Sequence, residues 1–192
     1  MQDDWISPWW QAACLPDRWD VCGVSVPSLS VWHTFALENI GNAYLCGGPI
    51  DKDAAASLLL FASTDYRGGR KLMQLENHRG RRMRRMFKKL RPQDMLAAHE
   101  ACQEYVDTCM RGVSRWNRNG KPCGAPYQYH IVARLSGGDP FKIERVWNMP
   151  YATARAMCDA VAEQNGDDSL MTLKAQKMED NWDESDKEAM AN

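Results

Sequence analysis

The spacing of apolar residues predicts helices over most of the chain. Between residues 124 and 164, three short apolar runs are separated by proline and glycine. The first run places four residues on one helical face: Tyr127, Ile131, Val132 and Leu135. Its aromatic and β-branched residues also fit a strand, but the helical spacing is favoured. Pro140 and Pro150 suit the first turns of two further helices, and Trp147 is predicted to be the largest core residue of this module.

The N-terminal half predicts two helices joined by a short loop. The first helix begins at Ser28 or Ser30, residues of a type that caps helix N-termini, and ends at Gly41. The second follows Asp51, and the two together predict an αα-hairpin. A longer helix is predicted after Pro92. Its buried stripe consists of Met95, Ala98, Cys102, Tyr105 or Val106, Cys109 and Val113.

The two ends of the chain differ in composition from its middle. Residues 1–27 carry tryptophans without a helical period, together with several prolines, which predicts an extended arm with one short strand at residues 20–26. Residues 167–192 are rich in Asp and Glu and predict a disordered acidic tail. The sequence therefore predicts an all-α fold, in which a small bundle of short helices at residues 28–166 lies between the arm and the tail.

The tryptophans of the arm have two interpretations. They anchor the arm on the core of its own chain, or Trp9 and Trp10 dock it on another subunit, since tryptophan is frequent at interface hot spots. The first interpretation is favoured.

Charge is distributed unevenly along the chain. There are 24 Lys and Arg against 25 Asp and Glu, so the net charge of −1 points to no particular partner. A predicted helix at residues 79–91, however, carries cations on almost all sides: Arg81, Arg82, Arg84, Arg85, Lys88 and Lys89. This helix either lies in solvent and faces the acidic tail or an acidic partner, or it binds nucleic-acid phosphates. The first interpretation is favoured because Phe87 alone supplies a ring for stacking on bases.

The sequence contains no recognisable catalytic or metal-binding motif. Its four histidines are far apart, and its seven cysteines are scattered without a CxxC pair. We therefore expect no enzymatic activity, no cofactor and no metal. The N-terminus lacks the basic and apolar regions of a signal peptide, and no apolar run is long enough for a membrane span. These features predict a cytosolic protein with reduced thiols and no membrane partner.

Four segments resemble small helical proteins encoded among the tail genes of tailed bacteriophages, some of which are tail assembly chaperones. Two of the segments are apolar helices, at residues 29–41 and 53–63, the first of which ends in glycine. The others are Ala-Pro-Tyr at residues 125–127 and a Trp-x-x-Pro step at residues 147–150. The resemblance covers most of the chain from residue 20 to residue 164.

The resemblance implies a non-enzymatic tail assembly factor in the host cytoplasm that binds tape-measure or tail-tube proteins. Such a chaperone covers apolar helices in grooves lined by methionine and aromatic side chains, which can re-pack. The methionines expected to line such grooves are Met73, Met83, Met86, Met95, Met110, Met149 and Met157. The residues expected to contact a partner are Trp9, Trp10, Trp147, Tyr151 and the six cations of residues 79–91.

Two alternatives stay open. One is a nucleic-acid-binding protein that uses the helix at residues 79–91. The other is a structural virion part, such as a head–tail connector or tail component, in which the tryptophan-rich arm docks on a neighbour. A homo-oligomer is compatible with all of these expectations.

Overall fold

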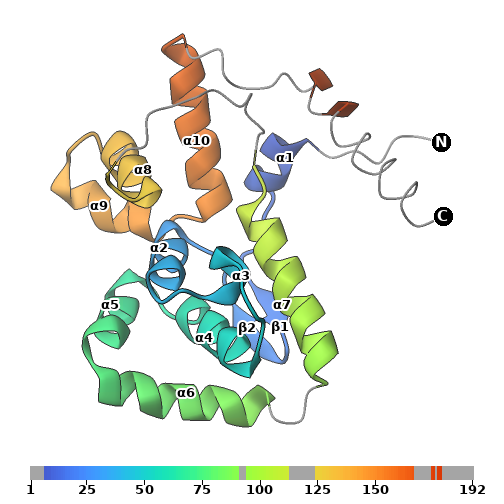
Figure 1. Cartoon of the computed structure of the whole chain (residues 1–192). Helices are drawn as coiled ribbons and strands as arrows, with labels where there is room; N and C mark the ends of the chain where they lie inside the picture. Colours follow the sequence, from blue (N-terminus) through green and yellow to red (C-terminus); the bar gives the residue numbers. More distant parts are fainter. Residues whose placement is uncertain (1–6, 91–93, 113–123, 167–173, 176, 179–192) are drawn as a thin grey trace.

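The computed structural model describes residues 7–90, 94–112, 124–166, 174–175 and 177–178 (Figure 1). The helices named within these ranges are α1 (Pro8–Ala13), α2 (Val31–Asn39), α3 (Ala43–Cys46), α4 (Lys52–Ala62), α5 (Tyr66–Gln74), α6 (Glu76–Leu90), α7 (Met95–Met110), α8 (Tyr127–Ser136), α9 (Pro140–Trp147) and α10 (Tyr151–Gln164). The strands β1 (Trp19–Val21) and β2 (Val24–Val26) lie between α1 and α2 in the sequence. Within the described ranges, no helix is long and apolar enough to cross a membrane.

Helix α4 forms the centre of the core. From Ala54 to Ala62 every residue is buried except the half-buried Ser57. The helix begins at Asp51, whose carboxylate accepts a hydrogen bond from the Ala54 N–H at 2.8 Å. Helices α2, α6 and α7 and strand β2 pack against α4. Its alanines leave room for these neighbours to approach closely.

The helices are arranged in two groups around α2 rather than in one bundle. Figure 1 shows α8, α9 and α10 on one side of α2, and α4, α5 and α6 on the other. The start of α2 is tied to the turn between α9 and α10. There the Val31 N–H donates to the Met149 carbonyl at 3.0 Å, and the Tyr151 N–H donates to the Leu29 carbonyl at 2.7 Å. This antiparallel bridge joins segments that are far apart in the sequence.

Trp147 fills the space where the two groups meet. Its ring stacks on that of Tyr66, with the ring centroids 5.7 Å apart and the planes inclined by 2°. Three further rings pack around it: Trp32, Phe35 and Tyr129. Trp147 itself is 4% exposed. The prediction that it is a core residue is confirmed.

The expectation of an all-α fold is wrong, because residues 19–26 form a two-stranded antiparallel hairpin rather than one strand. The turn residues Cys22 and Gly23 have φ values of 55° and 73°, and a type I′ turn needs positive φ at both positions. The Asp20 carboxylate accepts from the Gly23 N–H at 2.8 Å and fixes the turn. The hairpin belongs to the core through three buried residues, Val21, Val24 and Val26.

The prediction of an extended arm is wrong for residues 8–13, which form α1. Pro8 stands in the first turn of this helix, where its missing N–H removes no helical hydrogen bond. Ala12 is buried, and its carbonyl accepts from the Thr153 hydroxyl of α10 at 2.9 Å. Residues 1–6 and most of the acidic tail at 167–192 lie outside the described residues, so the predictions made for them stay predictions.

The other predicted helices are present, with some differences. Helix α7 ends at Met110, Met95 of its predicted buried stripe is half-buried, and Val113 lies outside the described residues. The predicted αα-hairpin contains an additional short helix, α3, in its loop. The basic stretch forms two helices that meet at Leu75, so α6 begins at Glu76 and has Gly80 in its interior. Residues 127–136 are helical, so the strand alternative for this segment is wrong.

Candidate functional site

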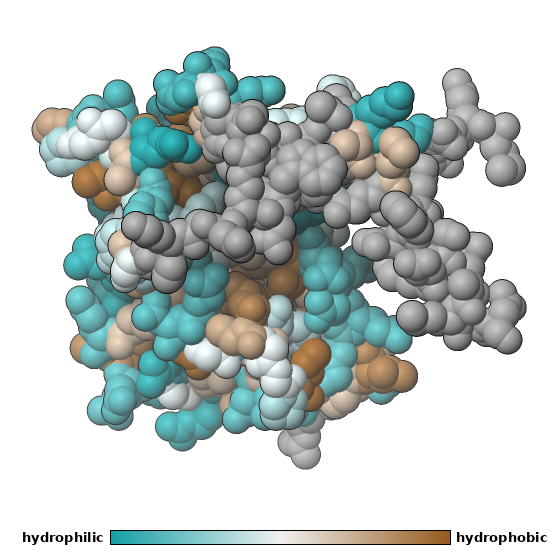
Figure 2. All heavy atoms as spheres, turned by 45° about the horizontal axis from the view of Figure 1, so that its top comes forward, coloured by the Kyte–Doolittle hydropathy of each residue, from teal (hydrophilic) through white to brown (hydrophobic). Residues whose placement is uncertain are grey.

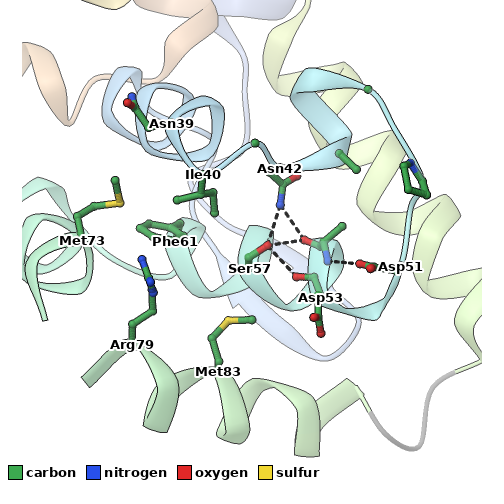
Figure 3. A pocket seen from close by; sticks show the side chains of 15 residues that line it. Asn39, Ile40, Asn42, Asp51, Asp53, Ser57, Phe61, Met73, Arg79 and Met83 are labelled. Carbon is green, nitrogen blue, oxygen red and sulfur yellow. Dashed lines mark hydrogen bonds between the residues drawn. The ribbon is translucent and has the colours of Figure 1, made fainter. Parts of the chain in front are cut away.

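A pocket opens between the α2–α3 loop, α4, α5 and α6 (Figure 3). Its volume is about 710 Å³, which lies in the usual range of about 300 to 1,000 Å³ for ligand sites. We call it the α4–α6 groove. Its residues come from neighbouring segments of the N-terminal half, so its shape depends on the packing of α6 on α4 and of α5 on α6.

One end of the α4–α6 groove is apolar. Figure 3 shows four side chains from different elements around this end: Ile40, Phe61, Met73 and Met83. Phe61 is buried, whereas the other three are half-buried and remain accessible from the groove. Methionine side chains are flexible and polarisable, so they adapt to apolar partners of different shape. This end is therefore suited to receive an apolar side chain.

The other end of the α4–α6 groove is polar and held in place by hydrogen bonds. The buried Asn42 donates through Nδ2 to the Ala54 carbonyl at 2.9 Å and to the Ser57 hydroxyl at 2.8 Å. Its Oδ1 accepts from the Tyr44 N–H at 3.1 Å, which caps α3. Asp51 caps α4 beside it. Because these side chains already make hydrogen bonds within the protein, they form a rigid polar wall of the groove.

Arg79 places a positive charge at the apolar end of the groove, whereas Asp51 and Asp53 lie toward its other end. Its side chain extends from α6 into the groove toward Phe61 (Figure 3). Its nearest carboxylate among the described residues is that of Glu76, one helical turn away at 3.9 Å. That contact is long and exposed, so it contributes little to stability. Arg79 is therefore placed to meet an acidic group on a molecule bound in the groove.

The groove combines an apolar surface with fixed polar groups, an arrangement typical of binding sites. Two of its polar residues, Asn42 and Asp51, cap helices, and the carboxylate of Asp53 in the first turn of α4 also lines it. In the described ranges, no three His, Cys, Asp or Glu side chains come together to hold a metal ion. What the groove offers is an adaptable apolar surface beside a cation.

The six predicted cations all lie on α6, at the edge of the molecule in Figure 1. Arg82 is half-buried and the other five, Arg81, Arg84, Arg85, Lys88 and Lys89, are exposed. The buried Met86 and Leu90 hold the helix on the core. The structure thus brings these predicted residues together on one continuous surface.

The predicted aromatic contacts lie elsewhere. Trp10 is 64% exposed and Trp9 is half-buried, both on α1, which packs on α10 far from α6 (Figure 1). Trp147 and Tyr151 are 4% and 7% exposed. Burial raises the pKa of the Tyr151 hydroxyl to about 12. Both residues are part of the core, so neither is placed to touch a partner in this structure.

Exposed apolar residues of the C-terminal helices are dispersed. On the face in Figure 2, hydrophobic residues form separate patches among hydrophilic ones. The most exposed is Phe141 of α9, at 93%. The others of this group are Tyr127, Tyr129 and Met157. Phe141 lines a pocket of about 640 Å³ together with Met149, but its other lining residues, Arg67, Glu144, Arg145 and Asn148, are polar or charged.

The groove is predictable from the sequence only in part. Met73 and Met83 were expected to line a groove because of their residue type, and they do. Met86 was also expected there, but it is buried under α6. The sequence predicts Ile40 and Phe61 as core residues of two helices, because no local signal indicates that the groove between α4 and α6 leaves them accessible or lining a pocket.

Comparisons with protein-family models, with curated proteins and with solved structures found no significant match.

Proposed function

We propose that this protein is a non-enzymatic, chaperone-like assembly factor of a tailed phage, which binds an apolar helix of a tape-measure or tail-tube protein in the α4–α6 groove. The observation that carries the proposal is the apolar end of the groove, where Ile40, Met73 and Met83 are accessible beside the buried Phe61. An amphipathic helix placed in an apolar groove is a common mode of peptide recognition.

The positions in the fold of the four segments that resemble tail-gene proteins support the proposal. The two apolar segments become α2 and α4, and Ala-Pro-Tyr leads into α8. The Trp-x-x-Pro step lies between α9 and α10 and is hydrogen-bonded to the start of α2. Segments that resemble tail-gene proteins thus pack on one another, and the segments at residues 29–41 and 53–63 also supply Ile40 and Phe61 to the groove.

The size of the groove fits a transient contact. Burial of one Leu, Ile or Met side chain contributes about 1.5 to 3 kcal/mol. Two such anchors contribute about 3 to 6 kcal/mol before the cost of association, less than the roughly 8 kcal/mol of a micromolar complex, so we expect an affinity weaker than about micromolar. A chaperone has to release its client when the tail assembles, and moderate affinity allows that release.

The test compares two variants of the full chain in induced or infected host cells. Met73→Gln together with Met83→Gln makes the groove polar, and Met157→Gln is the control because Met157 lies on α10, outside the groove. After nuclease treatment, we expect mass spectrometry to identify a long helical tail protein with the wild type and with the control. With the double variant, we expect at least a tenfold lower recovery.

Thermal unfolding of both variants checks that they remain folded. Equal recovery of the tail protein with a folded double variant would show that the groove is not its binding site. Recovery of no tail protein with the wild type would contradict the proposed function as a whole.

A structural virion component is the second candidate. It is favoured by Trp10, a large aromatic residue that is 64% exposed on a helix anchored to α10. In that case, Trp10→Ala should reduce incorporation of the chain into purified particles. Absence of the wild-type chain from such particles would rule out this candidate and agree with a chaperone that leaves before completion.

A further inference from the structure

The outer surface of α6 carries cations and no exposed apolar residue. Its exposed positions between residues 76 and 89 are Glu76, Asn77, His78, Arg81, Arg84, Arg85, Lys88 and Lys89. The apolar residues Met83, Met86, Phe87 and Leu90 are buried or half-buried. We call the five exposed arginines and lysines of α6 the basic surface. The basic surface faces solvent, and none of its five residues lines the α4–α6 groove.

These cations are not neutralised by the described part of the chain. The arginines that do bond, Arg81 and Arg84, donate through Nε to carbonyls of their own helix at 3.4 Å. Among the described residues, no carboxylate lies within 4.0 Å of any cation of the basic surface. Residues 65–90 hold ten Lys and Arg against two Asp and Glu, so the charge is concentrated here while the whole chain is at −1.

We propose that the basic surface binds the phosphate backbone of double-stranded nucleic acid without reading its sequence. A protein partner would need an apolar centre in the interface, because charged residues are depleted there, and this surface has none. Phosphates need only clustered cations. Phe87, the one aromatic residue of α6, is half-buried, so the surface offers no ring for stacking on single strands. These features favour a duplex.

The length of the basic surface sets the expected number of contacts. Residues 81 to 89 span about 12 Å at a rise of about 1.5 Å per residue. A duplex carries one charge per about 1.7 Å, and roughly half of these charges face the helix, which gives about three to four contacts. The logarithm of the affinity should therefore fall with the logarithm of the salt concentration at a slope of about −3. When the salt concentration rises from 50 to 200 mM, this slope corresponds to a decrease in affinity of about 60-fold.

The experiment measures fluorescence anisotropy of a labelled 25-base-pair duplex with the full chain at several salt concentrations. Arg85→Gln with Lys88→Gln removes two cations of the basic surface. Lys142→Gln with Arg145→Gln removes two exposed cations of α9 and is the control. We expect the slope to weaken by about two with the first pair, because each lost phosphate contact changes it by about one. The control pair should leave the slope unchanged.

Three outcomes would overturn the proposal. The first is no binding of the duplex at 50 mM salt, and the second is an equal loss with the control pair. The third is binding of the duplex only after the acidic residues of the C-terminal segment are replaced by Asn and Gln, namely Asp183, Glu184, Asp186 and Glu188. This result would mean that the acidic segment of the same chain, and not nucleic acid, occupies the basic surface. The groove variants at Met73 and Met83 test the proposed function separately and should bind the duplex like the wild type.

Discussion

Gly69 of α5 lies directly against the indole ring of Trp32 in α2. A Cβ atom on Gly69 would overlap Trp32 Nε1 and would come within 2.8 Å of Cε2. The indole has no room to move aside, because the rings of Phe35, Tyr66 and Trp147 pack around it. The absence of a side chain at Gly69 is therefore what allows α5 to pack on α2.

Gly69→Ala should destabilise the protein. Overpacking of a close-packed site costs about 1 to 3 kcal/mol, and for a chain of this size a loss of 2 kcal/mol lowers the melting temperature by roughly 6 °C. The matched control is Gly80→Ala, since a Cβ at Gly80 meets no atom within 4 Å. Gly80 lies inside α6, so alanine should raise stability by about 0.5 to 1 kcal/mol. Thermal and urea unfolding measure both. Equal effects of the two substitutions would contradict the packing described for Trp32.

His33 is held neutral inside the protein. The Ser30 N–H donates to His33 Nδ1 at 3.0 Å, so the proton lies on Nε2, which donates to the Thr64 carbonyl at 2.5 Å. Burial lowers the pKa of His33 to about 4. Protonation of Nδ1 would place its N–H against the Ser30 N–H, so that two donors face each other, and it would place a charge in the core.

Stability should therefore fall as the pH drops from 6.5 to 4. In this window the unfolded chain, with a His pKa of about 6.5, binds more protons than the folded chain, so acid favours unfolding by up to about 3 kcal/mol. Above pH 6.5 this contribution is constant. Urea unfolding at several pH values measures the slope. His33→Gln should be less stable at pH 7 but should lose this part of the slope, whereas His130→Gln, at an exposed position, should keep it. An unchanged slope in His33→Gln would contradict the assignment.

The sequence predicts most helices because their ends carry local signals. Asp51, Asp139 and Ser30 are found as the N-caps of α4, α9 and α2, and Pro140 is found in the first turn of α9. Such signals act within a few residues, so they can be recognised without knowledge of the fold.

Long-range features could not be predicted in this way. The hairpin was missed because Cys22, a residue without turn preference, takes positive φ beside Gly23. The α4–α6 groove arises only when α6 folds back on α4. The sequence predicts a helix at α6 but does not predict which helix it packs on. The contact between Gly69 and Trp32 is likewise not predictable from the sequence, because it joins two helices that are separated in the chain by α3 and α4.

The cysteines should differ widely in reactivity. Cys14 and Cys46 are exposed, whereas Cys102, Cys109 and Cys158 are buried. Burial raises the pKa of Cys102 to about 12 and that of Cys109 to about 11, so almost no thiolate is present at pH 8. A disulfide reagent followed by peptide mapping should label Cys14 and Cys46 within minutes and the buried thiols only after denaturation. Rapid labelling of Cys102 in the folded chain would contradict its position.

Asn42 should not tolerate a carboxylate, although Asp and Asn have nearly the same shape. Its Nδ2 donates to the Ala54 carbonyl and the Ser57 hydroxyl in a buried position. In Asn42→Asp a charged oxygen would face the Ala54 carbonyl, which cannot donate. We expect a loss of about 3 kcal/mol or more at pH 8, as for an uncompensated buried charge, against about 2 kcal/mol for Asn42→Ala, which loses the cap and the two Nδ2 hydrogen bonds but buries no charge.

The pH dependence separates this cause from a general defect in packing. Burial raises the pKa of a carboxyl group, so the folded variant would bind more protons than the unfolded one, and its deficit relative to the wild type should shrink as the pH falls toward 5. Asn165→Asp, at an exposed position, should show little deficit at any pH. Urea unfolding of the wild type and the three variants at pH 5 and pH 8 measures the difference. A deficit in Asn42→Asp that is the same at both pH values would mean that the side chain is not fixed between Ala54 and Ser57, and the polar wall of the groove would then be mobile.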